Sequence, residues 1–369
     1  MDYSQDPRIV MTLDAGATNL KFSAIRGNRL LTGPLSLPTE ANDLDRCLAT
    51  IIGGFRSVRG LLPEPPVAIS FAFPAPADYP AGLIMNVGGN LPAFEGCVPL
   101  GPILEEEFKI PVFINNDGDL FVYGEAIAGL LPQVNGMLEK AGSPKRYKNL
   151  FGLTLGTGLG GGIVHDGELF LGDNSNAGEV WLLRNKLEAD LSAEEGASIR
   201  AVRRVYARES GVSIDEAPEP KDIFEIGMGR REGNRAAAVE AFRQLGEVAG
   251  DVLAQALTLV DALAVIGGGI AGAHPLFLSA LVAAANASFD GGGKYRRLVQ
   301  QVFNLEEPEQ LRLFLAGERS EVTVPGSGRR IQFDPLQRTG VGLSRLGTSE
   351  AVAVGAHAFA LRQLGSPRN

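Results

Sequence analysis

Cysteine is scarce in this chain, with only Cys47 and Cys97 among 369 residues. Two isolated cysteines supply neither the paired spacing of a zinc knuckle nor a disulfide framework. Histidine is nearly as scarce, because only His165, His274 and His357 occur and they stand far apart. The sequence therefore predicts no zinc site, and it favours a reducing compartment such as the cytoplasm.

Long apolar runs and an excess of positive charge are also missing. No stretch approaches the roughly 18 apolar residues that a membrane span needs. The first residues, MDYSQDPRIV, include acids where a secretory signal would carry basic residues. The net charge of −9 opposes a general nucleic-acid surface, because phosphate binding relies on clustered Lys and Arg. We expect a cytoplasmic protein that binds neither membranes nor nucleic acids.

Two similar strand-turn-strand units are present instead. Residues 8–13 read as a strand, residues 14–18 (DAGAT) as a turn, and residues 21–25 as a returning strand. The pattern returns in residues 151–155, the glycine-rich segment 156–162 (GTGLGGG) and residues 163–164. At about 150 residues per domain, the length suits two lobes, and the repeated opening suggests a duplicated architecture.

Strands and helices alternate along the rest of the chain, which indicates an α/β protein. The expected strands cover 27–32, 66–73, 112–114 and 263–266, and the expected helices cover 43–57, 120–130, 194–209, 235–260 and 349–364. Residues 321–333, interrupted by PGSG at 325–328, read as a β-hairpin.

The glycine-rich segment 156–162 must be weighed against three other nucleotide motifs. It satisfies GxGxxG, but a strand rather than a helix follows it, which argues against a dinucleotide fold. Protein kinases are excluded by the lack of HRD and DFG triplets, and P-loop enzymes by the lack of GxxxxGK[ST]. What remains is a turn whose bare backbone N–H groups can approach phosphates. A simple tight β-turn is the competing interpretation.

Asp117 follows the expected strand 112–114 directly. A carboxylate at the end of a strand can accept a proton from a substrate hydroxyl. It can equally cap the helix that begins near Gly118, because Asp is a favoured N-cap residue. The local sequence leaves both roles open.

Several motifs, in order, resemble those of the ROK family (repressor, open reading frame, kinase). Residues 14–21 (DAGATNLK) are similar to its DxGGTxxK phosphate loop, and residues 115–125 to its END-A-N…GE motif. Residues 86–96 (NVGGNLPAFEG) are similar to its sugar loop NxPNLPGWxG, and residues 155–162 match its GTGxGGG loop. Residues 267–269 (GGG) fall where the family holds adenosine.

The resemblance implies a two-lobed actin-like ATPase (ribonuclease H-like) fold, with duplicated mixed β-sheets flanked by helices. The first, smaller lobe would comprise residues 1–130 and 349–369, and the second residues 131–348. It also implies a glucokinase-like enzyme that transfers phosphate from ATP to a hexose or an N-acetylated amino sugar. The family further leads us to expect a homodimer.

The resemblance assigns roles to single residues. Asp117 would be the catalytic base, and Asp14 would hold Mg²⁺, through water because Mg²⁺ keeps part of its hydration shell. The sugar ligands would be Asn90, Asn116, Asp117, Glu179 and Glu195. The ATP and phosphate ligands would be Asp14, Gly16, Thr18, Lys21, Gly156, Thr157, Gly158, Gly160, Gly267, Gly268 and Gly269.

The chain departs from the family pattern around residues 178–183 (GEVWLL). Most members carry ExGH followed by CxCGxxGC, which binds structural zinc, whereas this chain keeps Glu179 and lacks the His and all the Cys. Trp181 either stacks on a sugar or fills the space that the zinc loop leaves. The family's further sugar-binding Glu corresponds to Glu194 or Glu195, and we take Glu195.

Two other functions remain open. Many relatives of this type are sugar-responsive repressors, but the seven residues before the first strand at Arg8 are too few for a helix-turn-helix module. A catalytically silent sugar-binding member is the other alternative, which the lost zinc motif and Ala93, in place of the family's Gly, support. The sequence does not rank the possible sugars.

Overall fold

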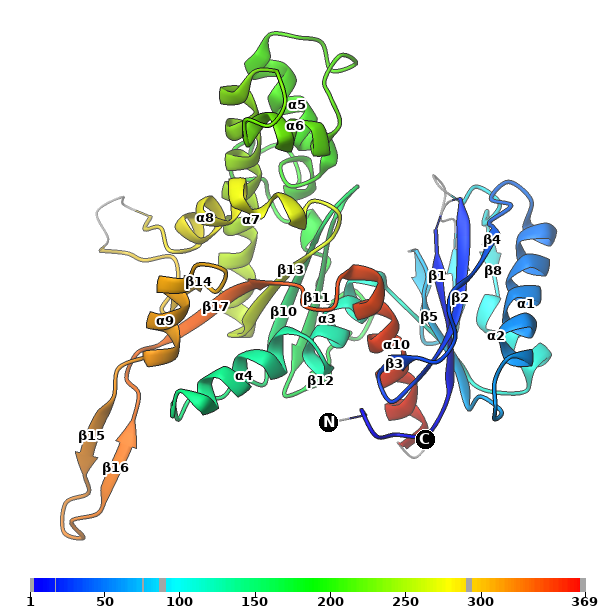
Figure 1. Ribbon diagram of the computed structural model, residues 1–369, viewed down its shortest axis with the longest axis horizontal. Coiled ribbons are helices and arrows are strands. Elements are labelled where there is room, and N and C mark those ends of the chain that lie inside the picture. The colour runs from blue at the N-terminus through cyan, green and yellow to red at the C-terminus, as the bar shows by residue number, and fades with distance from the viewer. Residues whose placement is uncertain (1–2, 17, 75, 86–90, 290–293, 366–369) are drawn as a thin grey trace. The chain divides into compact units, whose positions relative to one another are not determined.

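The computed structural model describes the chain except residues 1–2, 17, 75, 86–90, 290–293 and 366–369. It consists of two compact units (Figure 1). Unit 1 comprises residues 1–129, 167–177 and 346–369, and unit 2 comprises residues 130–166 and 178–345. The sequence-based division differs in assigning residues 167–177 and 346–348 to the second lobe and residue 130 to the first. No helix among the described residues is long and apolar enough to cross a bilayer.

Unit 1 is built on a mixed sheet with the strand order β3-β2-β1-β5-β9, in which β4 also pairs with β2. The strands are β1 (Val10–Ala15), β2 (Asn19–Arg26), β3 (Arg29–Leu30), β4 (Leu35–Pro38), β5 (Ala68–Ala72) and β9 (Val112–Asn115). Strands β1 and β2 form the expected antiparallel hairpin, and β5 and β9 continue the sheet parallel to β1. A small separate sheet contains β6 (Ala77–Asp78), β7 (Leu83–Met85) and β8 (Cys97–Val98), and β12 (Glu168–Leu169) also belongs to this unit.

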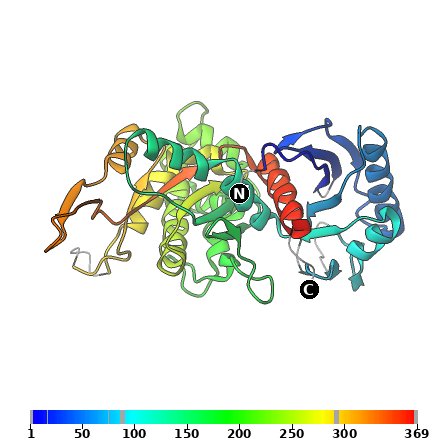
Figure 2. The same ribbon diagram turned by 90° about the horizontal axis from the view of Figure 1, so that it is seen from below.

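Helices cover both faces of this sheet. They are α1 (Leu44–Gly60), α2 (Leu100–Phe108), α3 (Asp117–Ile127) and α10 (Thr348–Gly365). Figures 1 and 2 show α1 and α2 on one face and α10 on the other. Helices α3 and α10 cross closely, because a Cβ on Gly124 would collide with the carbonyl of Ala351, and one on Gly355 with the carbonyl of Leu120. This crossing brings the N-termini of α3 and α10 to the same cavity of the unit.

Unit 2 repeats the plan with the strand order β11-β10-β13-β17-β14. The strands are β10 (Leu150–Leu155), β11 (Leu159–His165), β13 (Leu263–Gly267), β14 (Gln301–Asn304) and β17 (Arg338–Leu343). Strands β10 and β11 form an antiparallel hairpin, and β13, β17 and β14 run parallel to β10. The predicted duplication of mixed sheets is therefore confirmed. A separate hairpin pairs β15 (Ser320–Thr323) with β16 (Arg330–Phe333), as expected.

The core of unit 2 lies where its longest helix packs on the sheet. The helices are α4 (Leu130–Lys140), α5 (Ile199–Ser210), α6 (Pro220–Gly227), α7 (Arg235–Val260), α8 (His274–Ala285) and α9 (Pro308–Ala316), with short 3₁₀ helices η1 (Val180–Leu182), η2 (Ala193–Glu195) and η3 (Ala271–Ala273). Helix α7 has the predicted bounds and joins α5, α8, β10 and β13 in one apolar cluster. A single helix was expected over 194–209, but η2 comes first and α5 begins at Ile199.

Candidate functional site

The turn between β1 and β2 holds the first group of predicted residues. Gly16 donates its N–H to the carbonyl of Asn19 (3.1 Å), and its own carbonyl accepts the hydroxyl of Thr39 (2.6 Å). A Cβ on Gly16 would lie only 2.8 Å from the carbonyl oxygen of Asn19, so glycine is required there. Thr18 is exposed in the same turn. Thr39, which the sequence did not single out, follows β4 directly and braces this turn.

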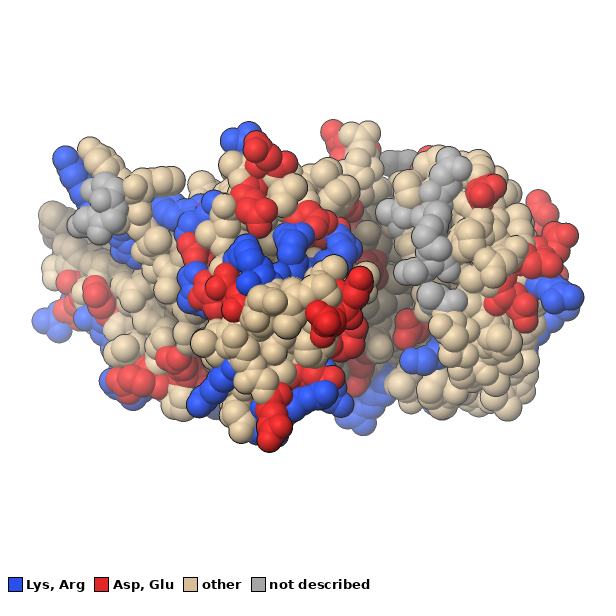
Figure 3. Space-filling model, turned by 90° about the horizontal axis from the view of Figure 1, so that it is seen from above, with Lys and Arg blue, Asp and Glu red and all other residues tan. Residues whose placement is uncertain are grey.

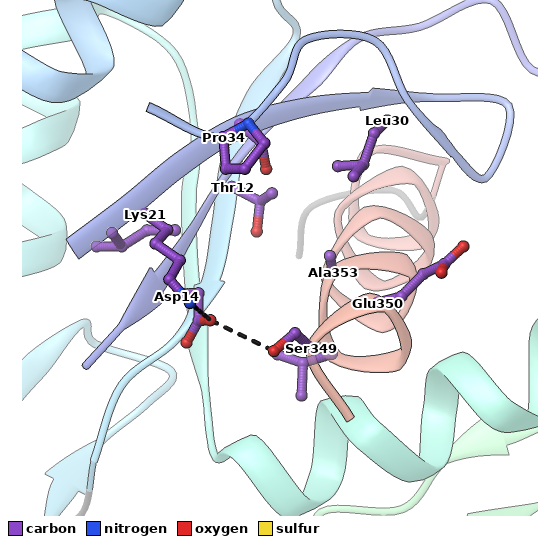
Figure 4. A pocket seen from close by; sticks show the side chains of 11 residues that line it. Thr12, Asp14, Lys21, Leu30, Pro34, Ser349, Glu350 and Ala353 are labelled. Carbon is purple, nitrogen blue, oxygen red and sulfur yellow. Dashed lines mark hydrogen bonds and ion pairs between the residues drawn. The ribbon is translucent and has the colours of Figure 1, made fainter. Parts of the chain in front are cut away.

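Asp14 lies at the end of β1 with its carboxylate accessible. Its side chain is 51% exposed, and Lys21, its cross-strand partner on β2, approaches it with an Nζ to Oδ2 distance of 3.9 Å. The hydroxyl of Ser349 at the start of α10 donates to Asp14 Oδ2 at 3.5 Å (Figure 4). These residues line one end of a cavity of about 270 Å³ beneath the β1–β2 hairpin. The carboxylate is thus held loosely and can accept a further ligand.

Asn116 and Asp117 begin helix α3, three residues earlier than predicted. Asn116 is the N-cap, and its Oδ1 accepts the N–H of Gly118 at 2.7 Å. Asp117 Oδ1 also accepts this N–H, at 2.9 Å. Because Asn116 serves as the cap, the competing interpretation of Asp117 as the cap residue loses force. The amide group of Asn116 can still donate hydrogen bonds.

Asp14 and Asp117 line the same cavity of about 290 Å³ in unit 1. Asp14 ends β1, Asp117 follows β9, and the parallel strand β5 between them leads into Phe73. Carboxyl ends of parallel strands are the usual place for ligands in α/β sheets. The cavity is also lined by Ala15, Ala72, Phe73, Pro74, Thr348, Ser349 and Val352. The arrangement places two carboxylates and two hydroxyls around one small space.

The surroundings of Asp117 raise the pKa of its carboxyl group. The protein mass around the carboxyl displaces the water that would stabilise its charge, and this raises the pKa of Asp117 above its ordinary value. Backbone N–H groups of Gly118 and Asp117 oppose the rise, and the negative charge of Asp14 adds to it. The side chain remains accessible to solvent. An accessible carboxylate with a raised pKa is suited to accepting a proton.

Asn90 lies outside the described residues. Another polar residue of unit 1, Glu125 of the predicted GE pair, is fully buried and accepts the N–H of Leu346 at 3.0 Å. This bond fixes the segment that leads into Thr348 and Ser349. The sequence pattern marked Glu125 but gave no reason for it. In the structure the residue connects α3 to the start of α10.

The second predicted phosphate turn lies between β10 and β11 in unit 2. Gly156 donates its N–H to the carbonyl of Gly158 (3.0 Å), which closes a tight turn around Thr157. Gly160 lies in β11 opposite Thr154, because the strand begins at Leu159, earlier than predicted. A Cβ on Gly160 would collide with the Thr154 hydroxyl. Only Gly156, Thr157 and Gly158 therefore make up the turn itself.

The glycine triplet 267–269 lies beside this turn. Gly267 ends β13, which runs parallel to β10, and Gly269 N lies 3.9 Å from the Cβ position of Gly156. Gly268 has a φ of +88°, a conformation that L side chains rarely adopt. The loop opens onto a cavity of about 310 Å³. This cavity is lined by Pro220, Lys221, Phe224, Glu225, Phe242, Gly269, Ile270, Gly272 and Ala273.

Glu195 lies in η2 and is engaged by arginines. Its two carboxylate oxygens accept hydrogen bonds from Arg200 (2.8 Å) and Arg204 (3.0 Å). These bonds lower the pKa of Glu195. The carboxylate is therefore committed to ion pairs within unit 2. The neighbouring Glu194 reaches the glycine turn instead, where its Oε2 accepts the N–H of Leu159 at 3.1 Å.

Glu179 lies just before η1, and the indole N–H of Trp181 donates to its Oε2. Trp181 is 37% exposed, so its indole lies partly at the surface. The hydrogen-bonded pair of Glu179 and Trp181 thus occupies the segment in which most of the family carries ExGH. Among the residues that the structure describes, no three His, Cys, Asp or Glu side chains come together as a metal centre.

The ROK family model matches residues 10–293. The chain belongs to the ROK family. Its match to solved structures extends over nearly the whole chain. The crystal structure of a glucokinase from Parabacteroides distasonis is 52% identical, covers 98% of this chain and 99% of its own, and superposes with a TM-score of 0.90. The actin-like ATPase fold of the ROK sugar kinases is thus confirmed.

Other relatives are more distant. The N-acetyl-D-glucosamine kinase of Vibrio cholerae is 27% identical over 276 residues, which cover 70% of this chain and 83% of that protein. The ROK family glucokinase of Streptomyces griseus, solved with glucose and AMPPNP, is 19% identical with a TM-score of 0.59, and covers 95% of this chain and 98% of its own. At that identity it shows the fold alone.

Proposed function

We propose that this ROK protein transfers the terminal phosphate of ATP to a hydroxyl group of a hexose or an N-acetylated amino sugar, with Asp117 as general base. The observation that carries the proposal is the cavity of unit 1 on which Asp14 and Asp117 meet. Relatives named glucokinase and N-acetyl-D-glucosamine kinase support the choice of sugars. Both sugar classes carry the hydroxyl that such a base would activate.

Asp117 would act on the sugar hydroxyl. Its raised pKa makes the carboxylate a better proton acceptor than an ordinary Asp, and solvent access leaves room for the hydroxyl. As the hydroxyl proton passes to an Asp117 oxygen, the sugar oxygen forms its bond to the γ-phosphorus. The bond from that phosphorus to the β–γ bridging oxygen breaks, and ADP leaves. Asn116, with its amide group, would orient the sugar beside this base.

Asp14 fits a magnesium ion held through water. Its carboxylate is a hard oxygen donor, is half exposed, and borders the cavity together with the hydroxyls of Thr348 and Ser349. When bound, Mg²⁺ supplies positive charge that offsets the phosphates. Lys21, 3.9 Å from Asp14, would add to this charge.

Unit 2 carries the features of a nucleotide site. The backbone of Thr157 and Gly158 offers N–H groups to phosphates, and the adjacent cavity has Phe224 and Phe242 as apolar walls and Lys221 and Glu225 as polar groups. An adenine ring suits such a cavity. Glu179 remains a proposed sugar ligand, and its contact with Trp181 would orient it.

The test is a coupled ADP-release assay with glucose, mannose, N-acetylglucosamine and N-acetylmannosamine. We expect release only with a sugar, and a loss of roughly 10²- to 10⁴-fold in Asp117→Asn, the usual size of a general-base contribution. The matched control is Asp45→Asn, because Asp45 and Asp117 are both acids in the first turn of a unit 1 helix. If Asp117 only supported its helix, the two variants would behave alike. Silence with every sugar, together with retained sugar binding, would instead identify a non-catalytic sugar-binding protein.

A further inference from the structure

Residues far from the second glycine turn in sequence hold it in place. Helix α5 begins beside the turn, and the N–H of Ile199 donates to the carbonyl of Gly156 at 2.8 Å. In the next position, the Arg200 guanidinium donates to the carbonyl of Thr157 at 3.3 Å. Glu194 accepts the N–H of Leu159, where β11 leaves the turn. The turn is thus bound at its beginning, its middle and its end.

Glu194 and Arg200 are also bound to each other. Arg200 donates to Glu194 Oε1 at 2.9 Å and to Glu195 Oε1 at 2.8 Å. The contacts Leu159–Glu194, Glu194–Arg200 and Arg200–Thr157 therefore form a closed ring around the turn. Gly158 lies inside the ring, where a Cβ would collide with Glu194 Oε2. The ring explains why this position of the turn carries glycine.

The charges of the ring bear on a phosphate ligand. The carboxylate of Glu194 lies against a turn whose N–H groups would receive phosphates, and like charges repel at this range. Arg200 is the only cation among the described residues that forms an ion pair with Glu194, whereas Glu195 also has Arg204. Figure 3 shows basic side chains gathered among acidic ones on the face formed by α5 and α6. Without Arg200, Glu194 would present an uncompensated negative charge to the nucleotide.

We propose that Glu194 and Arg200 are positioning residues of the nucleotide site, which fix the shape of the 156–158 turn and keep its charge suitable for phosphates. The inference rests on the proposed function, because it takes the turn to be a phosphate site. It predicts an effect on nucleotide affinity that is separate from any effect on the sugar.

The experiment measures Mg–ADP binding by titration calorimetry with Arg200→Gln. We expect about tenfold weaker binding, equivalent to the loss of one charge-assisted interaction. The Michaelis constant for ATP should rise in parallel, while that for the sugar stays unchanged. The matched control is Arg208→Gln, because Arg208 lies on the same helix, is equally exposed (52% against 50%) and pairs with Glu209 away from the turn.

A double variant separates charge from folding. Glu194→Gln removes the negative charge but keeps an oxygen that can accept the Leu159 N–H. Adding it to Arg200→Gln should therefore recover several-fold of the lost ADP affinity, which a general loss of structure would not do. Unchanged ADP binding in Arg200→Gln, or no recovery in the double variant, would overturn the inference. If the unaltered protein binds no ADP, the proposed function itself fails, so the two failures are distinguishable.

Discussion

The two glycine turns occupy equivalent positions in the two units, but their chemistry differs. Each connects the first two strands of a mixed sheet and precedes a strand parallel to the first. The turn of unit 1 carries the exposed carboxylate of Asp14 and is braced by the neutral hydroxyl of Thr39. The turn of unit 2 has no acid of its own and is held by the ion pair of Glu194 and Arg200.

Under the proposed function, this difference corresponds to different ligands at the two turns of a duplicated architecture. A carboxylate at a turn favours a hydrated cation, whereas bare N–H groups favour an anion. Asp14 of the unit 1 turn is loosely paired, and in the proposed function a hydrated cation would complete its contacts. The unit 2 turn must neutralise the acid that supports it, and Arg200 does so. Changes at the unit 1 turn should therefore alter kcat and its Mg²⁺ dependence, whereas changes at the unit 2 turn should alter the Michaelis constant for ATP.

The largest effect is expected at the unit 1 turn. Asp14→Asn should lower kcat by roughly 10²- to 10³-fold, the usual loss when one preorganised electrostatic contact of a transition state is removed. The Mg²⁺ concentration for half-maximal rate should rise as well. Initial rates over a range of Mg²⁺ at saturating sugar and ATP measure both quantities.

A matched control for Asp14 is available in the same unit. Glu64→Gln also removes an exposed carboxylate, with Arg26 at 4.0 Å much as Asp14 has Lys21 at 3.9 Å. It should leave kcat and the Mg²⁺ dependence unchanged. Equal behaviour of the two variants would mean that Asp14 only shapes its turn.

The units should also differ in their response to acid, because His357 of α10 is fully buried in unit 1. Burial lowers the pKa of its imidazole from 6.5 to about 4. In the folded state His357 therefore binds a proton only at lower pH than in the unfolded state. The free energy of unfolding decreases as pH falls below 6.5, and this decrease continues until about pH 4. Between pH 7 and pH 4 the loss is about 3 kcal/mol.

Denaturant unfolding of the His357→Leu variant at pH 7 and pH 4 measures how much of this loss of stability comes from His357. The variant should lose about 3 kcal/mol less than the unaltered protein. His165→Leu, the same substitution at an exposed position of unit 2, is the control. A variant as sensitive to acid as the unaltered protein would rule out His357 as the source.

Local signals predicted the features that the two units share. Both hairpins, the two turns and helix α7 are formed by contacts between residues that are close in the sequence. For example, Asn234 caps α7 by accepting the N–H of Ala237. Helix α3 begins three residues before its predicted start, because Asn116 caps it by accepting the N–H of Gly118. Strand β11 begins at Leu159, earlier than the predicted residue 163, because the glycines at its start have a low strand propensity.

Helices and strands that are buried on several sides were not predicted from the sequence. Helix α8 has Phe277, Leu281 and Ala285 buried among other apolar residues, so no polar face marks its period. Strand β17 is buried along most of its length and contains two glycines, so it lacks alternation. The Glu194–Arg200 support could not be predicted either, because it joins residues that are 35 and 43 positions from their partners in the turn.

A smaller effect is expected when the unit 2 turn is altered. Gly158→Ala would bring a Cβ into collision with Glu194 Oε2 and disturb the ring of contacts. We expect the Michaelis constant for ATP to rise about tenfold while kcat stays within about twofold, because the proposed base, Asp117, lies in unit 1 and is unaltered. Gly136→Ala, in an open position on α4, is the control. A fall in kcat without a change for ATP would contradict the division between the two turns.

The smallest effect concerns the coupling between the two carboxylates of unit 1. Because the Asp117 pKa is raised, kcat should fall on the acid side at a pH above the ordinary carboxyl range near 3.9, where a protonated base cannot accept the hydroxyl proton. Asp14 contributes to that rise, so this limb should move to lower pH in the residual activity of Asp14→Asn, whereas Glu64→Gln should leave it in place. Profiles of kcat against pH at saturating substrates measure the limb. A limb that stays fixed in both variants would mean that the charge of Asp14 does not reach the base, and that the two acids act independently in the cavity they share.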